Sequence, residues 1–85
     1  MNVFLWIQAD DAEDSQASEF FMRRTCARLG AEVIGVVNCY PDEDAIASYT
    51  ATCAIAEKQQ ALIVASNRQL QRKAPVEAMA SARGL

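Results

Sequence analysis

Asn2–Ile7 (NVFLWI) is the stretch that decides the fold, and it opens a chain of 85 residues. A short apolar run rich in branched and aromatic side chains is typical of a strand buried on both faces of a sheet. The acidic stretch Gln8–Ser15 follows it. Its carboxylates suit the start of a helix, where they accept free backbone N–H groups and complement the helix dipole. We therefore predict a central strand that leads directly into a helix.

The remainder of the chain repeats this order of strand and helix. The expected elements are a helix from residues 12–15 to Leu29 with Gly30 behind it, a strand over Ala31–Val37, a loop over Asn38–Asp42, a helix from an Asp42 cap to Gln60, a strand over Ala61–Ala65, and a helix that begins at Pro75 and ends at Gly84. Such units with short connections predict a parallel sheet with right-handed crossovers. We predict one three-layer α/β/α domain over residues 1–85, in the order β-α-β-α-β-α, with strand order 2-1-3.

Both of the first two helices carry an apolar side at helical spacing. In the first helix it comprises Ser18, Phe21, Met22, Thr25, Cys26 and Leu29. In the second it comprises Ala45, Ile46, Tyr49, Cys53, Ala56 and Gln60. Phe20 falls on the polar side of the first helix. Gly35, inside the second strand, predicts a close approach of backbone or helix.

Composition and charge restrict the classes of function. A net charge of −3 and a pI near 4.7 disfavour a free-standing nucleic-acid surface, because such surfaces use Lys and Arg to neutralise phosphates. Three cysteines without a CxxC spacing, and no histidine, argue against a disulfide framework and a Cys/His zinc site. No apolar segment approaches the length of a membrane span, and the amino terminus lacks a basic signal region. We therefore expect a cytoplasmic protein with no membrane partner.

A ligand site in an open parallel sheet lies beyond the carboxyl ends of the strands, where the strand order reverses. The residues expected there are Gln8, Ala9, Asp10 and Asp11 after the first strand, Cys39 and Tyr40 after the second, and Ser66, Asn67 and Arg68 after the third. This set holds no histidine base, no glycine-rich phosphate loop and no nucleotide fingerprint, and Ser66 has no base beside it. We predict no catalytic residue, no cofactor and no metal.

Asp10 and Asp11 admit two interpretations. Paired carboxylates can hold Mg²⁺. An acidic pair after the first strand is also similar to a response-regulator receiver, but that family needs an aspartate after the third strand, where this chain has Ser66 and Asn67. Helix-capping acids are the favoured interpretation. Cys39, expected in a loop, is the candidate reactive thiol, but no cation adjacent in sequence lowers its pKa, so an unreactive cysteine is favoured.

The whole chain resembles the amino-terminal catalytic domain of the serine recombinases, the resolvase/invertase family. VFLWIQADD (residues 3–11) is similar to that family's first strand, its Tyr-x-Arg-Val-Ser-Thr pattern and its acidic loop. FFMRRTCARLGAEVIGVV (20–37) is similar to its basic helix, glycine and Val/Ile strand, and ALIVASNRQLQRK (61–73) to its strand followed by Leu-Asp-Arg-Leu-x-Arg. The resemblance implies a resolvase-like fold, shortened before the family's fourth strand, long dimerisation helix and DNA-binding region.

The departures from that family fall on its catalytic residues. Gln8 stands where the resemblance places the nucleophilic serine, and a side-chain amide does not attack a phosphodiester. Trp6 stands at the position of an arginine, and Asn67 at that of the aspartate before the matching Arg68. Arg72 matches a second arginine only with a shift of one residue. The resemblance therefore implies a catalytically inactive relative.

These observations predict a non-enzymatic module that acts through protein–protein contacts, as a homo-oligomer or with a protein partner. The candidate contact surfaces are the unpaired edge of the third strand, which is the stronger argument, and Phe20, since a single exposed Phe is common. The alternative is an accessory DNA- or phosphate-binding protein that uses the charges of Arg68, Arg72 and Lys73. The candidate ligand contacts are Asp10, Asp11, Ser66, Arg68, Arg72 and Lys73. A small-molecule or phosphate site at the carboxyl edge of the sheet is a third hypothesis, which rests on geometry alone.

Overall fold

The computed structural model describes residues 1–67 of the chain. Their elements are β1 (Asn2–Gln8), α1 (Ala12–Arg28), β2 (Glu32–Cys39), α2 (Ala45–Lys58) and β3 (Leu62–Asn67). This order, β-α-β-α-β, agrees with the prediction as far as it extends. The third helix, predicted from Pro75 to Gly84, lies outside the described residues.

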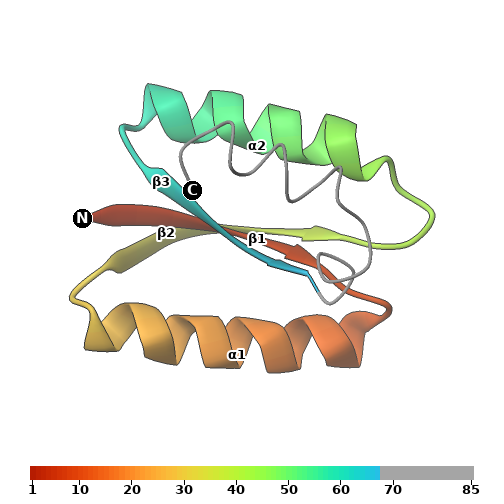
Figure 1. The fold of residues 1–85 in the computed structure, drawn as a ribbon, viewed down its shortest axis with the longest axis horizontal. Helices are drawn as coiled ribbons and strands as arrows, with labels where there is room; N and C mark the ends of the chain where they lie inside the picture. Colours follow the sequence, from red (N-terminus) through yellow and green to blue (C-terminus); the bar gives the residue numbers. More distant parts are fainter. Residues whose placement is uncertain (68–85) are drawn as a thin grey trace.

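The strands form one parallel sheet in the order β2-β1-β3, which confirms the predicted topology. Figure 1 shows α1 along one face of the sheet and α2 along the other. Every residue from Val3 to Ile7 is buried, because β1 has a neighbouring strand on each side and a helix on each face. The apolar run at the start of the chain is therefore the centre of the α/β fold.

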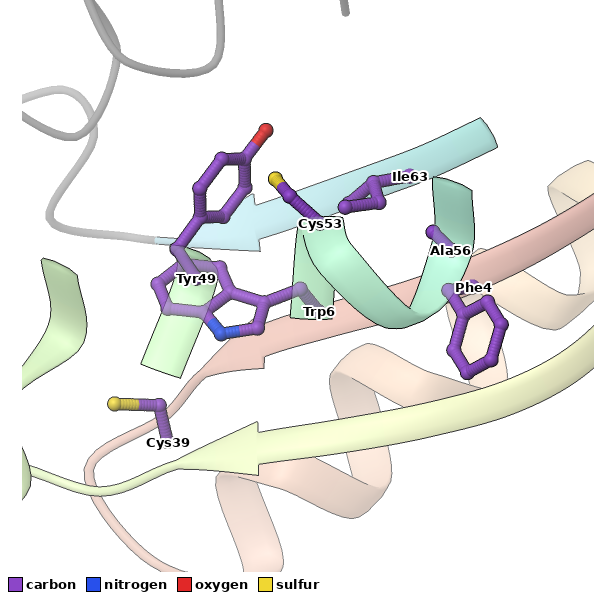
Figure 2. Close-up of a cluster of buried hydrophobic side chains, with 7 residues drawn as sticks. All are labelled: Phe4, Trp6, Cys39, Tyr49, Cys53, Ala56 and Ile63. Carbon is purple, nitrogen blue, oxygen red and sulfur yellow. The ribbon is translucent and has the colours of Figure 1, made fainter. Parts of the chain in front are cut away.

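Alternate residues of β1 belong to two separate hydrophobic clusters, as the period of two in a strand requires. Figure 2 shows the cluster on the α2 side, which comprises Phe4, Trp6, Cys39, Tyr49, Cys53, Ala56 and Ile63. The cluster on the α1 side comprises Val3, Leu5, Ile7, Ala9, Met22 and Cys26. Both layers of the domain are thus held to the same central strand.

A one-residue bulge interrupts β2 opposite the start of β1. Phe4 is paired with Gly35, whereas the residue before Phe4 is paired with Val33, so Ile34 is extra. The extra residue reverses the alternation of side chains along β2. Val33 and Val36, three positions apart, consequently pack on the same side, against the α1 cluster.

Gly35 is required at this bulge for a steric reason. A β-carbon at residue 35 would collide with the ring of Phe4, which is itself buried in the α2 cluster. The close approach predicted at Gly35 is therefore made by a side chain rather than by backbone or a helix.

The buried side of α1 is narrower than predicted. Met22 and Cys26 are buried as expected, but Phe21 and Leu29 are 69% and 73% exposed, and Thr25 is exposed. The prediction that these three residues lie on the inner side is wrong. The helix lies on a sheet of only three strands, so a narrow line of residues at one-turn spacing touches the sheet and the flanks of the helix face outward.

In α2, Tyr49, Cys53 and Ala56 are buried as predicted, whereas Ile46 and Gln60 are exposed. Gln60 lies beyond the end of the helix, with a φ of 54°. It occupies the position that Gly30, with a φ of 72°, holds after α1. Both helices therefore end in a left-handed residue, and only the first has glycine there.

The cap residue of α1 is one of those predicted, whereas the cap residue of α2 differs from the predicted one. Asp11, one of the expected caps, accepts a hydrogen bond from the backbone N–H of Asp14 at 2.8 Å. At α2 the cap is Asp44, whose carboxylate accepts from the N–H of Ala47 at 3.1 Å, and not Asp42. The two aspartates were equally suited by type, and only the backbone path selects between them.

Two strands run further than predicted. β2 continues through Cys39, which is buried at the strand end and is not a loop residue. β3 continues through Ser66 and Asn67, which were expected in a loop. Both outer strands pair with β1 up to its last residue, Gln8, and this pairing keeps them extended as far as Cys39 and Asn67. In the described part of the chain, no helix has the length and apolar character needed to cross a membrane.

Candidate functional site

The carboxyl edge of the sheet brings together three residues that the sequence placed there. Gln8, the last residue of β1, is paired with Cys39 on one side and with Asn67 on the other. Ser66 is paired with Ile7, one step earlier in the same ladder. Arg68, Arg72 and Lys73, the candidate phosphate contacts, lie outside the described residues. The ends of the three strands thus meet at one level of the sheet, as chain order predicts.

Trp6 is a core residue. Its side chain is fully buried, and its indole Nε1 donates a hydrogen bond to Ser48 Oγ at 3.1 Å. Its ring meets that of Tyr49 edge to face, with centroids 5.2 Å apart and an interplanar angle of 88° (Figure 2). The position where the resemblance places an arginine therefore points into the α2 side of the core, where a guanidinium would be desolvated.

The carboxylates of Asp11 and Asp14 both accept hydrogen bonds at the start of α1. Asp11 caps the helix, and Asp14 reaches back so that its Oδ2 accepts the backbone N–H of Asp10 at 3.0 Å. Within residues 1–67, no group of three or more potential metal-ligating side chains comes together. The geometry supports the helix-capping interpretation for Asp11, whereas Asp10 takes part through its backbone N–H.

A contact that the sequence did not reveal joins α1 to the β2–α2 connection. Ser15 is buried in the first turn of α1, and its Oγ lies 3.3 Å from the Tyr40 hydroxyl. Tyr40 in turn donates its backbone N–H to Glu43 Oε1 at 3.0 Å. The signal that was missed is the polar Ser15 on the buried stripe of α1, two turns before Met22 and three turns before Cys26.

Cys39 has the environment of an unreactive thiol. It is fully buried, and burial is the main cause that raises its pKa, followed by the negative charge of Glu43. Asp44 and Asp42 raise the pKa of Cys39 further, and only a hydrogen bond with Ser48 opposes them. A nucleophilic cysteine needs the opposite, an exposed sulfur beside positive charge.

The outer surface of α1 carries the candidate contact residue. Phe20 is 66% exposed, as its predicted position on the polar side requires, and Phe21 beside it is 69% exposed. The Arg24 guanidinium lies over the Phe20 ring, 5.8 Å from its centroid. Arg23 is engaged with Glu19 of the same helix through a salt bridge of 2.8 Å. Apolar surface and positive charge thus occur together on this helix.

No family model matches the chain, and no curated protein and no solved structure matches it. The resemblance to the serine recombinases stays a prediction.

Proposed function

We propose that the chain is a non-catalytic module that works through protein–protein contacts and associates with copies of itself. The observation that carries this proposal is the exposure of Phe20 and Phe21 at the middle of α1. A benzyl side chain is among the largest sources of apolar contact area in interfaces. One exposed Phe is ordinary, but two in succession on a charged helix offer an anchor for a partner.

The polar groups of the carboxyl edge support the non-catalytic part of the proposal. Gln8 carries an amide, Cys39 is buried among acids, and Trp6 is committed to the core. Asp11 caps α1, and the backbone N–H of Asp10 is bound by Asp14. None of these groups combines an activated nucleophile with a base.

The proposal includes descent from a serine recombinase-like domain that no longer cleaves DNA, acting in the cytoplasm. The residues behind it are Trp6, Gln8 and Asn67, which replace the arginine, serine and aspartate that the resemblance implies. Incubation with supercoiled plasmid tests this part. We expect neither nicking nor covalent attachment to DNA, and either product would contradict a non-catalytic module.

Sedimentation velocity over a wide range of protein concentration tests self-association. We expect the wild-type sedimentation coefficient to rise with concentration and that of a Phe20→Ser/Phe21→Ser double variant to stay at the monomer value. Ile46→Ser, at a residue that is 53% exposed on α2, is the matched control. A wild-type chain that stays monomeric at the highest concentration overturns the proposal, as does a control that loses association equally.

A further inference from the structure

We infer that two copies of this chain pair through the outer surface of α1, with the two helices antiparallel and Phe20 beside the two-fold axis. This rests on the proposed function and deepens it by naming the partner, a second copy, and its orientation.

Phe20 lies at the centre of the helix and faces away from the sheet. Since α1 spans Ala12–Arg28, eight residues precede Phe20 and eight follow it. At about 100° per residue, Phe20 points roughly 120–160° away from the buried residues Ser15, Met22 and Cys26. Pairing through Phe20 therefore leaves the packing of α1 on the sheet intact.

Two small residues share this surface with Phe20. Ala17 lies one turn before it and Ala27 two turns after it, and both are exposed. Small side chains allow two helices to approach closely, and each Phe20 ring then fills the space beside the other helix. Apolar contact is thus concentrated at the position where a two-fold axis brings identical residues together.

Charge decides the direction of pairing. The acidic residues of α1 all precede Phe20 and its arginines all follow it: Glu13, Asp14 and Glu19 against Arg23, Arg24 and Arg28. The helix dipole accounts for acids in the first turn and for Arg28 in the last, but Arg23 and Arg24 lie outside those turns. A parallel pair would set like charges against each other, whereas an antiparallel pair sets each acidic half against a basic half.

Glu13 and two arginines supply the specific contacts. At 1.5 Å per residue, Glu13 lies about 10 Å before Phe20, and Arg24 and Arg28 lie about 6 Å and about 12 Å after it. All three are exposed and lie within roughly 60° of one another around the helix. In the antiparallel pair, Glu13 is therefore level with the gap between Arg24 and Arg28 of the partner subunit, and two-fold symmetry makes this contact twice.

The interface of one helix against another is smaller than that of a standard stable complex. We therefore expect a dimer in the micromolar range or weaker, with an affinity that falls as salt screens the exposed pairs. The Glu19–Arg23 salt bridge lies within one helix and is kept in the dimer.

Charge reversal with complementation tests the arrangement. Glu13→Arg and Arg24→Glu each place like charges in contact twice per dimer, so each variant alone should associate roughly tenfold more weakly than wild type. An equimolar mixture of the two variants restores opposite charges at both contacts. The mixture, and the Glu13→Arg/Arg24→Glu double variant, should therefore associate close to the wild-type affinity. Glu57→Arg and Lys58→Glu, exposed on α2, are the matched controls.

Sedimentation equilibrium gives the affinities, and far-UV circular dichroism establishes that each variant is folded. If wild type dimerises but folded single variants are unaffected, or their mixture does not recover, the antiparallel α1 pair is overturned while the proposed self-association stands. If wild type does not associate, both are overturned.

Discussion

The ring of Phe4 in β1 fills the space in which Gly35 of β2 would carry a side chain. The two residues are direct partners in the ladder, next to the bulge at Ile34. Phe4 is buried beneath α2, so the ring has little freedom to move aside. The bulge, the glycine and the aromatic ring thus form a single structural unit.

Gly35→Ala should destabilise the protein by about 1–3 kcal/mol, because the new methyl group overpacks a filled core. Urea denaturation measures the loss. In a Phe4→Leu background the same substitution should cost clearly less, since the colliding ring atoms are gone. Equal costs in the two backgrounds would show that the contact with Phe4 is not the reason for glycine.

Ser48→Ala should lower the free energy of unfolding by about 1–3 kcal/mol, because it leaves the buried indole N–H of Trp6 without its acceptor. Ser48→Thr keeps a hydroxyl and should be milder. Denaturant unfolding of both variants provides the comparison. A neutral Ser48→Ala would mean that the 3.1 Å bond contributes nothing net.

Asp44→Ala should cost about 1 kcal/mol through loss of the α2 cap, and Asp44→Asn, which keeps an accepting oxygen, should cost much less. Asp42→Ala removes an exposed acid of the same short loop and is the matched control. Thermal unfolding of the three variants distinguishes the two aspartates. A larger effect at Asp42 would contradict the cap assignment.

Gln60→Gly should stabilise the protein by about 1 kcal/mol, because glycine adopts a φ of 54° without the steric cost that glutamine bears. The same glycine at Gln59, which has a φ of −97°, only adds flexibility to the unfolded chain and should destabilise. Thermal unfolding of the pair provides the test, and a destabilised Gln60→Gly would contradict it.

The stability of the protein should fall as pH rises above 9.0, the ordinary pKa of a cysteine thiol. The folded pKa of Cys39 is raised, first by burial and then by Glu43, so the unfolded thiol ionises at lower pH than the folded one. The stability that the protonated Cys39 thiol provides is fully present below the pKa of the unfolded thiol. It is lost as pH rises through the pKa of the folded thiol.

Unfolding free energies of wild type and Cys39→Ala across this pH range test the point. The difference between their pH profiles should show the loss, and parallel profiles would contradict it. Glu43→Gln removes one of the causes and should speed the alkylation of Cys39 by iodoacetamide.

The sequence was sufficient for the fold because β1 is unambiguous. A strand buried on both faces, followed by acids that start a helix, leaves few topologies open, and the order β2-β1-β3 is the predicted one. The bulge at Ile34 was not predictable, because one extra residue in a run of Val and Ile leaves the apolar pattern unchanged. The exposure of Phe21 and Leu29 depends on the width of the sheet beneath α1, and the helical spacing of apolar residues gives no information about that width.

The position of the candidate site was predictable, but the burial and the hydrogen-bond partners of its side chains were not. Chain order alone brings Gln8, Cys39 and Asn67 to one edge. That Cys39 is buried depends on where β2 ends, and the polar Asn38 before it made the strand look shorter than it is. The link from Ser15 to Tyr40 joins residues 25 positions apart, and no local pattern encodes it.

Trp6 gives the molecule an internal fluorescent reporter. It is the single tryptophan of the chain, is shielded from solvent, and lies on the side of the sheet opposite α1. Its emission should therefore shift to longer wavelength when the core opens and stay constant when two copies meet through α1. Intrinsic Trp6 fluorescence therefore distinguishes unfolding from dissociation of the pair without any added label.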